Sequence, residues 1–256
     1  MSNTPILCIN KFSIDKIQEG ASVLIIGQRG SGKSWLIKHI LDTKGWTGVA
    51  TAISPTDRMN PFYSFHGINV HSAVPDTWSD EIKANPDQHK VAILDDCVAS
   101  KHITAYNELI RSTKQPNMTL IVTTKKALNL APDIRANFDY VFVFRENRPS
   151  KDVKIKRIWD YYAGSFPTLA SFKKVLATTT EGYRTMVIDV QAQDRKVCWY
   201  GYATAVNLVI AVAPDEIPQE PVIVPADDAT PEPVIDGTTD ATPDTAVDGS
   251  YSCSLL

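Results

Sequence analysis

The segment from Val23 to Ser34 constrains the fold of this chain more than any other. It opens with four apolar, mostly β-branched residues, Val23–Ile26, which are typical of a buried strand. The motif G-x-x-x-x-G-K-S comes next, and an apolar pattern of helical period follows it, at Leu36, Ile37, Ile40 and Leu41. This succession of strand, glycine-rich loop and helix predicts a phosphate-binding P-loop. A chance glycine-rich turn would explain the glycines but not the strand, the Lys-Ser pair and the helix together.

The chemistry of the loop follows from its residue types. Glycines allow successive backbone N–H groups to converge on an anion, and the positive end of the following helix adds to the attraction. We expect Lys33 to reach the β- and γ-phosphates of a nucleotide and the Ser34 hydroxyl to bind Mg²⁺. The candidate nucleotide-binding residues are Gly27, Gln28, Arg29, Gly30, Ser31, Gly32, Lys33, Ser34 and Trp35.

A second informative segment is the apolar run 90–94, which ends in two carboxylates, Asp95 and Asp96. We expect this strand to be buried beside the P-loop strand, so that Asp95 joins the Mg²⁺ shell. Asp96 would then orient or deprotonate the water that attacks the γ-phosphate. Because many buried strands end in Asp at a turn, the pattern is informative only downstream of a P-loop.

The third apolar strand, 119–122, also ends in polar residues, and two readings of that end stay open. Thr124 and Lys125 would sense the γ-phosphate, or they would only terminate the strand. Further along, 140–144 reads as another core strand, and two helical patterns follow it. Alternating strands at 185–190 and 197–202 predict an antiparallel hairpin at one edge. The expected fold is therefore α/β, with a mostly parallel central sheet flanked by helices.

The composition divides the chain into two parts. Residues 214–256 hold seven of the sixteen prolines and ten acidic residues but no Lys or Arg, so residues 1–213 carry a net charge of +7. We expect 1–213 to form the folded domain and 214–256 to be a disordered acidic tail, because so few apolar residues cannot offset the ordering entropy. The basic excess is compatible with a polyanionic partner, but an ordinary solvated surface would show it too.

Cysteine usage and hydropathy favour a soluble intracellular protein. The four cysteines are scattered, with no C-x-x-C pair, which argues against a zinc site and for a reducing compartment. No apolar run approaches the ~20 residues of a membrane span. The final Cys253-Ser-Leu-Leu matches the prenylation pattern only loosely, since one middle position is aliphatic and no polybasic segment precedes it.

Taken together, these motifs resemble the genome-packaging ATPases of large DNA viruses and virophages, the poxvirus-type branch of the FtsK–HerA superfamily. The similarity covers roughly residues 20–160. Its more specific marks are the loop Ser54-Pro55 … Asn60-Pro61-Phe62-Tyr63, the Asp-Asp form of the Walker B motif, and Arg111 ahead of the next core strand. Here Lys125 stands where the family commonly has Gln, and Ser112 where it often has His or Lys.

The resemblance implies a RecA-like ATPase that forms a ring, usually a hexamer, and drives double-stranded DNA into a capsid. It implies Mg²⁺ and ATP as cofactors, and a capsid protein or portal vertex as a partner. The host cytoplasm or viral factory is the implied location, with association with the virion. Lys33 and Asp96 match catalytic positions, and Arg111 matches an arginine finger that reaches the neighbouring subunit's nucleotide. Arg135 is the alternative finger, and an ordinary exposed helix arginine is the alternative reading of Arg111.

Two other functions share the P-loop. A small-molecule phosphotransferase such as a nucleotide kinase would also need an Arg-rich lid and an acceptor pocket. The adjacent carboxylates and the extra strand between the two Walker motifs speak against it. A non-catalytic scaffold that assembles when it binds nucleotide is the third possibility, and loss of turnover on changing Asp96 would separate it from an enzyme.

Overall fold

The fold was examined in a computed structural model of the chain. It describes residues 6–75, 87–97, 110, 117–125, 130, 132–146, 151–163, 166–192, 197–201, 207–211 and 254–255. Within these residues, no helix has the length and apolar character that crossing a membrane requires.

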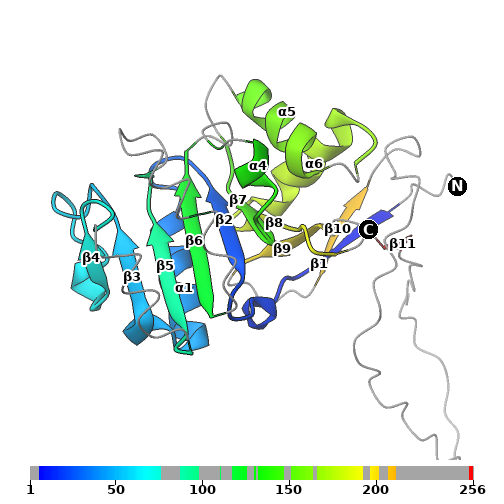
Figure 1. Ribbon diagram of the computed structural model, residues 1–256. Helices are drawn as coiled ribbons and strands as arrows, with labels where there is room; N and C mark the ends of the chain where they lie inside the picture. Colours follow the sequence, from blue (N-terminus) through cyan, green and yellow to red (C-terminus); the bar gives the residue numbers. More distant parts are fainter. Residues whose placement is uncertain are drawn as a thin grey trace, which may run out of the picture.

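The core of the molecule is an eight-stranded, mostly parallel sheet (Figure 1). In spatial order its strands are β4 (Asn69–His71), β3 (Ala50–Ile53), β5 (Lys90–Leu94), β6 (Met118–Thr124), β2 (Ser22–Ile26), β7 (Tyr140–Val143), β8 (Thr185–Asp189) and β9 (Val197–Tyr200). The first six run parallel, whereas β8 and β9 form an antiparallel hairpin at one edge. The predicted fold class is confirmed.

One expectation about strand order is wrong. The strand that carries the acidic pair, β5, does not lie beside the P-loop strand β2, because β6 is inserted between them. Hydrophobicity identifies both as buried strands but carries no information about which buried strand is the neighbour. With strands roughly 4.8 Å apart, the acids stand two strand spacings from the P-loop, and the end of β6 fills the gap.

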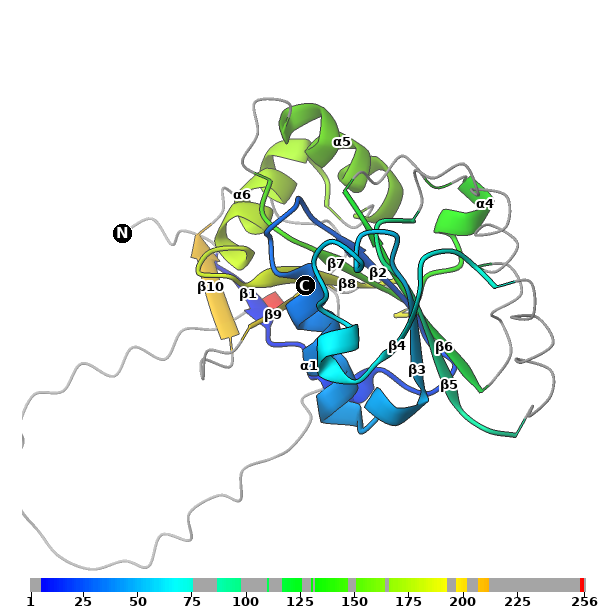
Figure 2. The ribbon, with the colours of Figure 1, turned by 90° about the vertical axis from the view of Figure 1, so that its left-hand side faces the viewer.

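Helices cover both faces of the sheet, and alternate residues of each strand feed two separate cores. Val23 and Ile25 of β2 pack with α1 (Lys33–Lys44), whereas Leu24 and Ile26 face the other side. That side is covered by α4 (Pro132–Arg135), α5 (Lys151–Tyr162) and α6 (Leu169–Thr179). Figure 2 shows α1 and α4 on opposite sides of the sheet. Short 3₁₀ turns complete the structure at Ile14–Lys16, Thr47–Val49 and Ser64–His66.

A second, small sheet lies beyond the hairpin. In it β1 (Ile6–Asn10) pairs antiparallel with β10 (Asn207–Ala211) and parallel with β11 (Ser254–Leu255). The sequence analysis does not predict β10 or β11, because their short apolar runs stand beside or within the proline-rich segment. Apart from Ser254 and Leu255, the predicted acidic tail lies outside the described residues, as does Cys253.

Candidate active site

The P-loop forms the predicted connection between β2 and α1. Gly27 has no room for a side chain, since a Cβ there would come 2.5 Å from Ser31 Oγ and 3.0 Å from Phe144 Cβ. Gly32 caps the helix with a φ of 101°, a conformation that side-chain-bearing residues rarely adopt. The loop is tied to β6 as well, because the Gly27 N–H donates to Thr124 O at 3.0 Å. Sequence and space therefore agree on the tight turn that an anion cradle needs.

Lys33, the first residue of α1, is folded back over the loop. Its side chain is only 6% exposed, and its ammonium group donates to Gln28 O at 3.1 Å. It also lies 4.0 Å from a carboxylate oxygen of Asp96. Burial lowers the pKa of Lys33, and the negative charges of Asp96 and Asp95 oppose that shift. A phosphate in the loop would supply the further negative charge that this buried cation favours.

Asp95 and Asp96 follow the carboxyl end of β5, as predicted. Asp95 is buried, and its backbone N–H donates to Ile53 O of the adjacent strand at 3.0 Å. Asp96 has a φ of 53°, an unusual backbone conformation that Asp tolerates better than most residues. This left-handed turn brings the Asp96 carboxylate within reach of Lys33 on the far side of β6.

Thr123 of β6 links the two acids through one hydroxyl group. Thr123 Oγ1 donates to Asp95 Oδ1 at 2.6 Å and accepts from the Asp96 N–H at 2.9 Å. Burial raises the pKa of Asp95, and the hydrogen bond from Thr123 counteracts part of that rise. Because Thr123 is fully buried, the hydroxyl fixes the relative position of the two carboxylates.

The polar end of β6 continues into the site. The Lys125 ammonium group lies 3.0 Å from a carboxylate oxygen of Asp96, so two lysines approach the same acid from different elements. Thr124 is buried, and its carbonyl is the acceptor for the P-loop N–H of Gly27. The strand end is thus part of the site, which is what the sensor reading of Lys125 requires.

Tyr63 approaches the site from the loop after β3. Its ring is 1% exposed, and its hydroxyl faces the side chains of Ser34 and Asp95 without a hydrogen bond of standard geometry to any described residue. Burial, together with the nearby Asp95, raises the pKa of Tyr63 well above its ordinary value. A neutral phenol therefore points an unused donor at the place between the two residues predicted to bind Mg²⁺.

Asp57 holds the loop that carries Tyr63. Its carboxylate accepts from the backbone N–H groups of Phe62 and Tyr63, both at 2.9 Å, and from Ser64 Oγ at 2.8 Å. Burial alone would raise the pKa of Asp57, but these hydrogen bonds outweigh it and the pKa lies below its usual value. The loop is therefore a positioned part of the site.

The remaining predicted loop residues differ in exposure. Arg29 and Gly30 are exposed, and Gln28 is half-buried. Ser31 Oγ is buried and makes no hydrogen bond to any residue that the structure describes, so its donor is available to a ligand. Trp35 is largely exposed, and its ring contacts Phe62 and His66, with centroids 5.3 and 5.8 Å away.

The two candidate arginine fingers have different outcomes. Arg111 lies outside the described residues. Arg135, at the end of α4, is engaged within its own chain. Its guanidinium donates to Leu130 O at 3.1 Å and stacks 3.6 Å from the centroid of the Tyr161 ring. In this structure, Arg135 stabilises the packing of α4 on α5.

The donor set suits Mg²⁺ bound with a nucleotide. Mg²⁺ in such sites takes one or two protein oxygens and fills the rest of its shell with phosphate and water. Ser34 and Asp95 supply those oxygens, and the orphaned Tyr63 hydroxyl lies beside both, where a metal-bound water needs a partner. Among the described residues, no group of three or more His, Cys, Asp or Glu side chains could bind a metal ion by itself.

Comparison with known sequences shows similar proteins in several large DNA viruses. The chain is 31% identical over 218 residues to the uncharacterised protein L437 of Acanthamoeba polyphaga mimivirus, covering 74% of this chain and 75% of L437. It is 30% identical to the uncharacterised protein 075L of invertebrate iridescent virus 6, covering 71% and 74% of the two chains. The chain belongs to the L437 family. No profile of a described protein family matches it.

Solved structures show where the fold of the L437-family chain occurs elsewhere. It superimposes on B204, the DNA-packaging ATPase from Sulfolobus turreted icosahedral virus, with a TM-score of 0.53 and 20% identity, over 72% of this chain and 98% of B204. VirB4 of Thermoanaerobacter pseudethanolicus gives a TM-score of 0.50 at 10% identity, over 80% and 98%. At these identities the likeness establishes the fold.

Sequence reasoning left three site residues without a role: Thr123, Tyr63 and Asp57. Thr123 had a signal, since a threonine inside a fully apolar strand needs a buried hydrogen-bond partner. Tyr63 and Asp57 had none of comparable strength, because their loop contains turn residues that predict an ordinary surface connection.

Proposed function

We propose that this chain is an ATPase that moves double-stranded DNA into a viral capsid. The observation that carries the proposal is the convergence of Lys33, Asp95, Asp96 and Lys125 at the carboxyl ends of three parallel strands. Support also comes from the fold shared with B204, a DNA-packaging ATPase, and from relatives in viruses with large DNA genomes.

The site would hold Mg·ATP with its γ-phosphate toward the acidic pair. The P-loop amides, Ser31 and Lys33 would bind the β- and γ-phosphates, and Ser34 with Asp95 would hold Mg²⁺, which neutralises charge on the phosphates. Asp96 would orient the attacking water and accept its proton. Lys125, now paired with Asp96, would turn to the charge that develops on the transferred phosphoryl group.

Assembly would complete the site. We assign the ATPase domain to residues 1–213, working as a ring, with a hexamer as the expected form, and residues 214–256 to an acidic tail. Arg111 of one subunit would reach the nucleotide of the next, where such a guanidinium contributes about 10³–10⁵ in rate. A capsid protein or portal vertex would anchor the ring in the host cytoplasm or viral factory.

ATP turnover of the full chain tests this function, measured with and without linear duplex DNA over a range of protein concentrations. We expect DNA to stimulate hydrolysis, and specific activity to rise as subunits assemble. Because the DNA contacts would be with phosphates, stimulation should be independent of sequence and fall with salt. Full activity in a dilute monomer that ignores DNA would contradict the translocase and favour a phosphotransferase.

Asp96→Asn separates an enzyme from a nucleotide-gated scaffold. It should lower turnover by about 10²–10⁴-fold while ATP still binds, since the carboxylate acts on the water and not on the phosphates. Asp42→Asn is the matched control, because Asp42 is an exposed α1 carboxylate paired with Lys38 away from the site. Unchanged turnover in Asp96→Asn would exclude the proposed chemistry.

Mixing experiments address the trans arginine. Lys33→Ala and Arg111→Ala should each be inactive alone, and their mixture should regain part of the activity, because some interfaces pair an intact P-loop with an intact finger. Arg135→Ala should instead mainly lower stability, since this guanidinium supports α4 and α5. Recovery with Arg135→Ala and none with Arg111→Ala would reverse the assignment.

A further inference from the structure

A cavity of about 370 Å³ opens beside the P-loop, on the side away from the acidic pair. Its walls are the front of the P-loop, residues 28–31, the end of β7 at Phe144 and Arg145, and the turn between α6 and β8. Its volume falls within the range of small-molecule sites. Neither the proposed hydrolysis nor the Mg²⁺ site uses it.

The order of the strands fixes which end of a nucleotide could reach this cavity. Asp96 and Lys125 follow β5 and β6, on one side of the P-loop strand β2, and the cavity lies on the other side, toward β7 and β8. The phosphate that is cleaved must face the acids. The nucleoside at the opposite end of the triphosphate is therefore directed toward the cavity.

An unusual turn places an aromatic ring at the cavity. In the turn Glu181–Arg184, the Arg184 N–H donates to Glu181 O at 3.1 Å. Gly182 and Tyr183 both have positive φ, 58° and 62°, the pattern of a type I′ turn. A bulky aromatic residue is a clear outlier in this conformation. Tyr183 lines the cavity and is nonetheless 88% exposed, so packing does not explain its presence.

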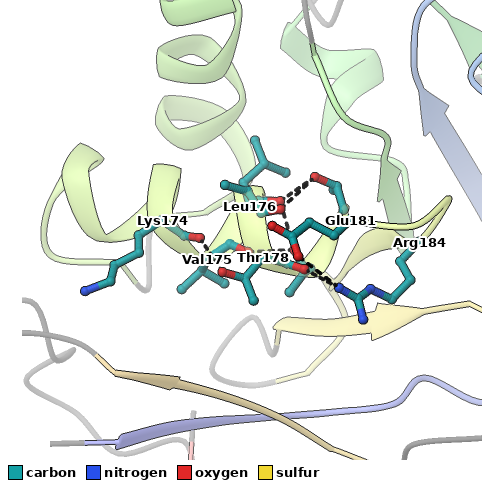
Figure 3. Close-up of polar contacts among 9 residues, drawn as sticks. Lys174, Val175, Leu176, Thr178, Glu181 and Arg184 are labelled. Atoms are coloured by element: carbon teal, nitrogen blue, oxygen red, sulfur yellow. Dashed lines mark hydrogen bonds and ion pairs between the residues drawn. The ribbon is translucent and has the colours of Figure 1, made fainter. Parts of the chain in front are cut away.

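Arg184 fixes this turn to the end of α6, as Figure 3 shows. Its guanidinium donates to Thr178 O at 2.9 Å, lies 3.8 Å from the Glu181 carboxylate, and sits 5.6 Å from the Trp199 ring centroid. A cation near the last carbonyls of a helix is favourable. The turn is thus held in place before any ligand arrives, which reduces the ordering cost of binding.

The charge of the lining also fits a nucleotide. Three described lining residues are arginines, Arg29, Arg145 and Arg184, and none of the described lining residues is acidic. An aromatic face among guanidinium groups suits a base attached to a phosphorylated sugar.

We propose that this cavity is the nucleoside subsite and that the Tyr183 ring stacks on the base. The inference rests on the proposed function, because it takes the triphosphate to lie in the P-loop. Stacking uses the π-face that every base has, so we expect GTP to bind within a few-fold of ATP.

Three variants of the full chain test the subsite, each titrated calorimetrically with ATP and with inorganic tripolyphosphate, which has no base. Tyr183→Gly removes the ring and accepts the positive φ, so its Tm should not fall. We expect it to bind ATP about 10-fold more weakly and tripolyphosphate unchanged. Tyr183→Phe should match wild type. Phe65→Ala, which removes an 81%-exposed ring outside the cavity, should also match.

The two ligands separate the ways of failing. If wild type binds both and Tyr183→Gly binds ATP normally, the nucleoside subsite is wrong and the P-loop proposal stands. Equal weakening of both ligands in Tyr183→Gly would likewise overturn base stacking. If wild type binds neither ligand, the proposed function itself fails, and the subsite fails with it.

Discussion

Lys125 and Asp96 form an ion pair of 3.0 Å across the ends of two adjacent strands, β6 and β5. Lys33 approaches the same carboxylate to 4.0 Å from the P-loop. Without nucleotide, the acid proposed to handle water is therefore held by the two cations proposed to handle phosphate. A γ-phosphate would compete for both lysines and release the carboxylate for its work.

Lys125→Met should slow hydrolysis more than it weakens binding. The variant loses a cation where charge develops, so we expect kcat to fall about 10²-fold. The Kd for ATP should change less than about threefold, because Lys125 is paired with Asp96 in the nucleotide-free site. Turnover and equilibrium binding measure the two effects, with Lys38→Met, an exposed α1 lysine, as control. A wild-type kcat would leave strand termination as the role of Lys125.

Thr123→Val should loosen the acidic pair while keeping the shape of the side chain. It leaves the Asp96 N–H and one Asp95 oxygen without the hydroxyl that joins them, at a cost of about 1–3 kcal/mol in the free energy of unfolding. Urea titration measures this loss, and Thr123→Ser should restore most of it. A defect in Thr123→Ser as large as in Thr123→Val would assign the effect to the methyl group.

Tyr63→Phe should raise the Mg²⁺ concentration needed for half-maximal activity by about 3- to 10-fold, since it deletes one hydrogen bond to a metal-bound water. Its Tm should not fall, because the hydroxyl has no partner among the described residues. Tyr162→Phe is a matched control, as Tyr162 is also buried with an unpartnered hydroxyl, but on α5. Binding of Mn²⁺ in the presence of nucleotide gives a readout independent of turnover. Identical Mg²⁺ curves for the two variants would contradict the assignment.

Asp95→Asn should stabilise the nucleotide-free protein at neutral pH. Burial raises the pKa of Asp95 above its ordinary 3.8, so between the unfolded and folded pKa values the folded state binds more protons. Stability contributed by this group therefore falls as the pH rises through that window. The free energy of unfolding, measured from pH 3 to 7, should favour Asp95→Asn increasingly as the pH rises. Mg·ATP should reverse the order, and a variant less stable than wild type at pH 7 would refute the argument.

The P-loop was predictable residue by residue, because its strand, spacing and helix are all local features. The chain positions of Asp95 and Asp96 were predictable for the same reason. The place of β5 in the sheet was not, since strand order depends on long-range pairing that hydrophobicity does not encode. The hydroxyl of Thr123 gains its role only from β6 lying between β5 and β2.

Tyr63 and Asp57 show a different limit. Their loop contains prolines and polar residues, as a surface connection does, yet three hydrogen bonds to one carboxylate fold it inward. A single sequence reveals neither the burial of the Tyr63 ring nor the direction of its hydroxyl. Such residues become visible only when the packing around a buried polar atom can be inspected.

The main-chain bond from Gly27 to Thr124 has a mechanical consequence. Bonds of the same kind join Asp95 to Ile53 and Phe144 to Ile26, so backbone links run without a break across the catalytic edge of the sheet. Such an edge behaves as a stiff plate that cannot flex one strand at a time. Force generated by cleavage must leave it through swinging side chains or through the rotation of whole subunits, which makes each subunit a lever.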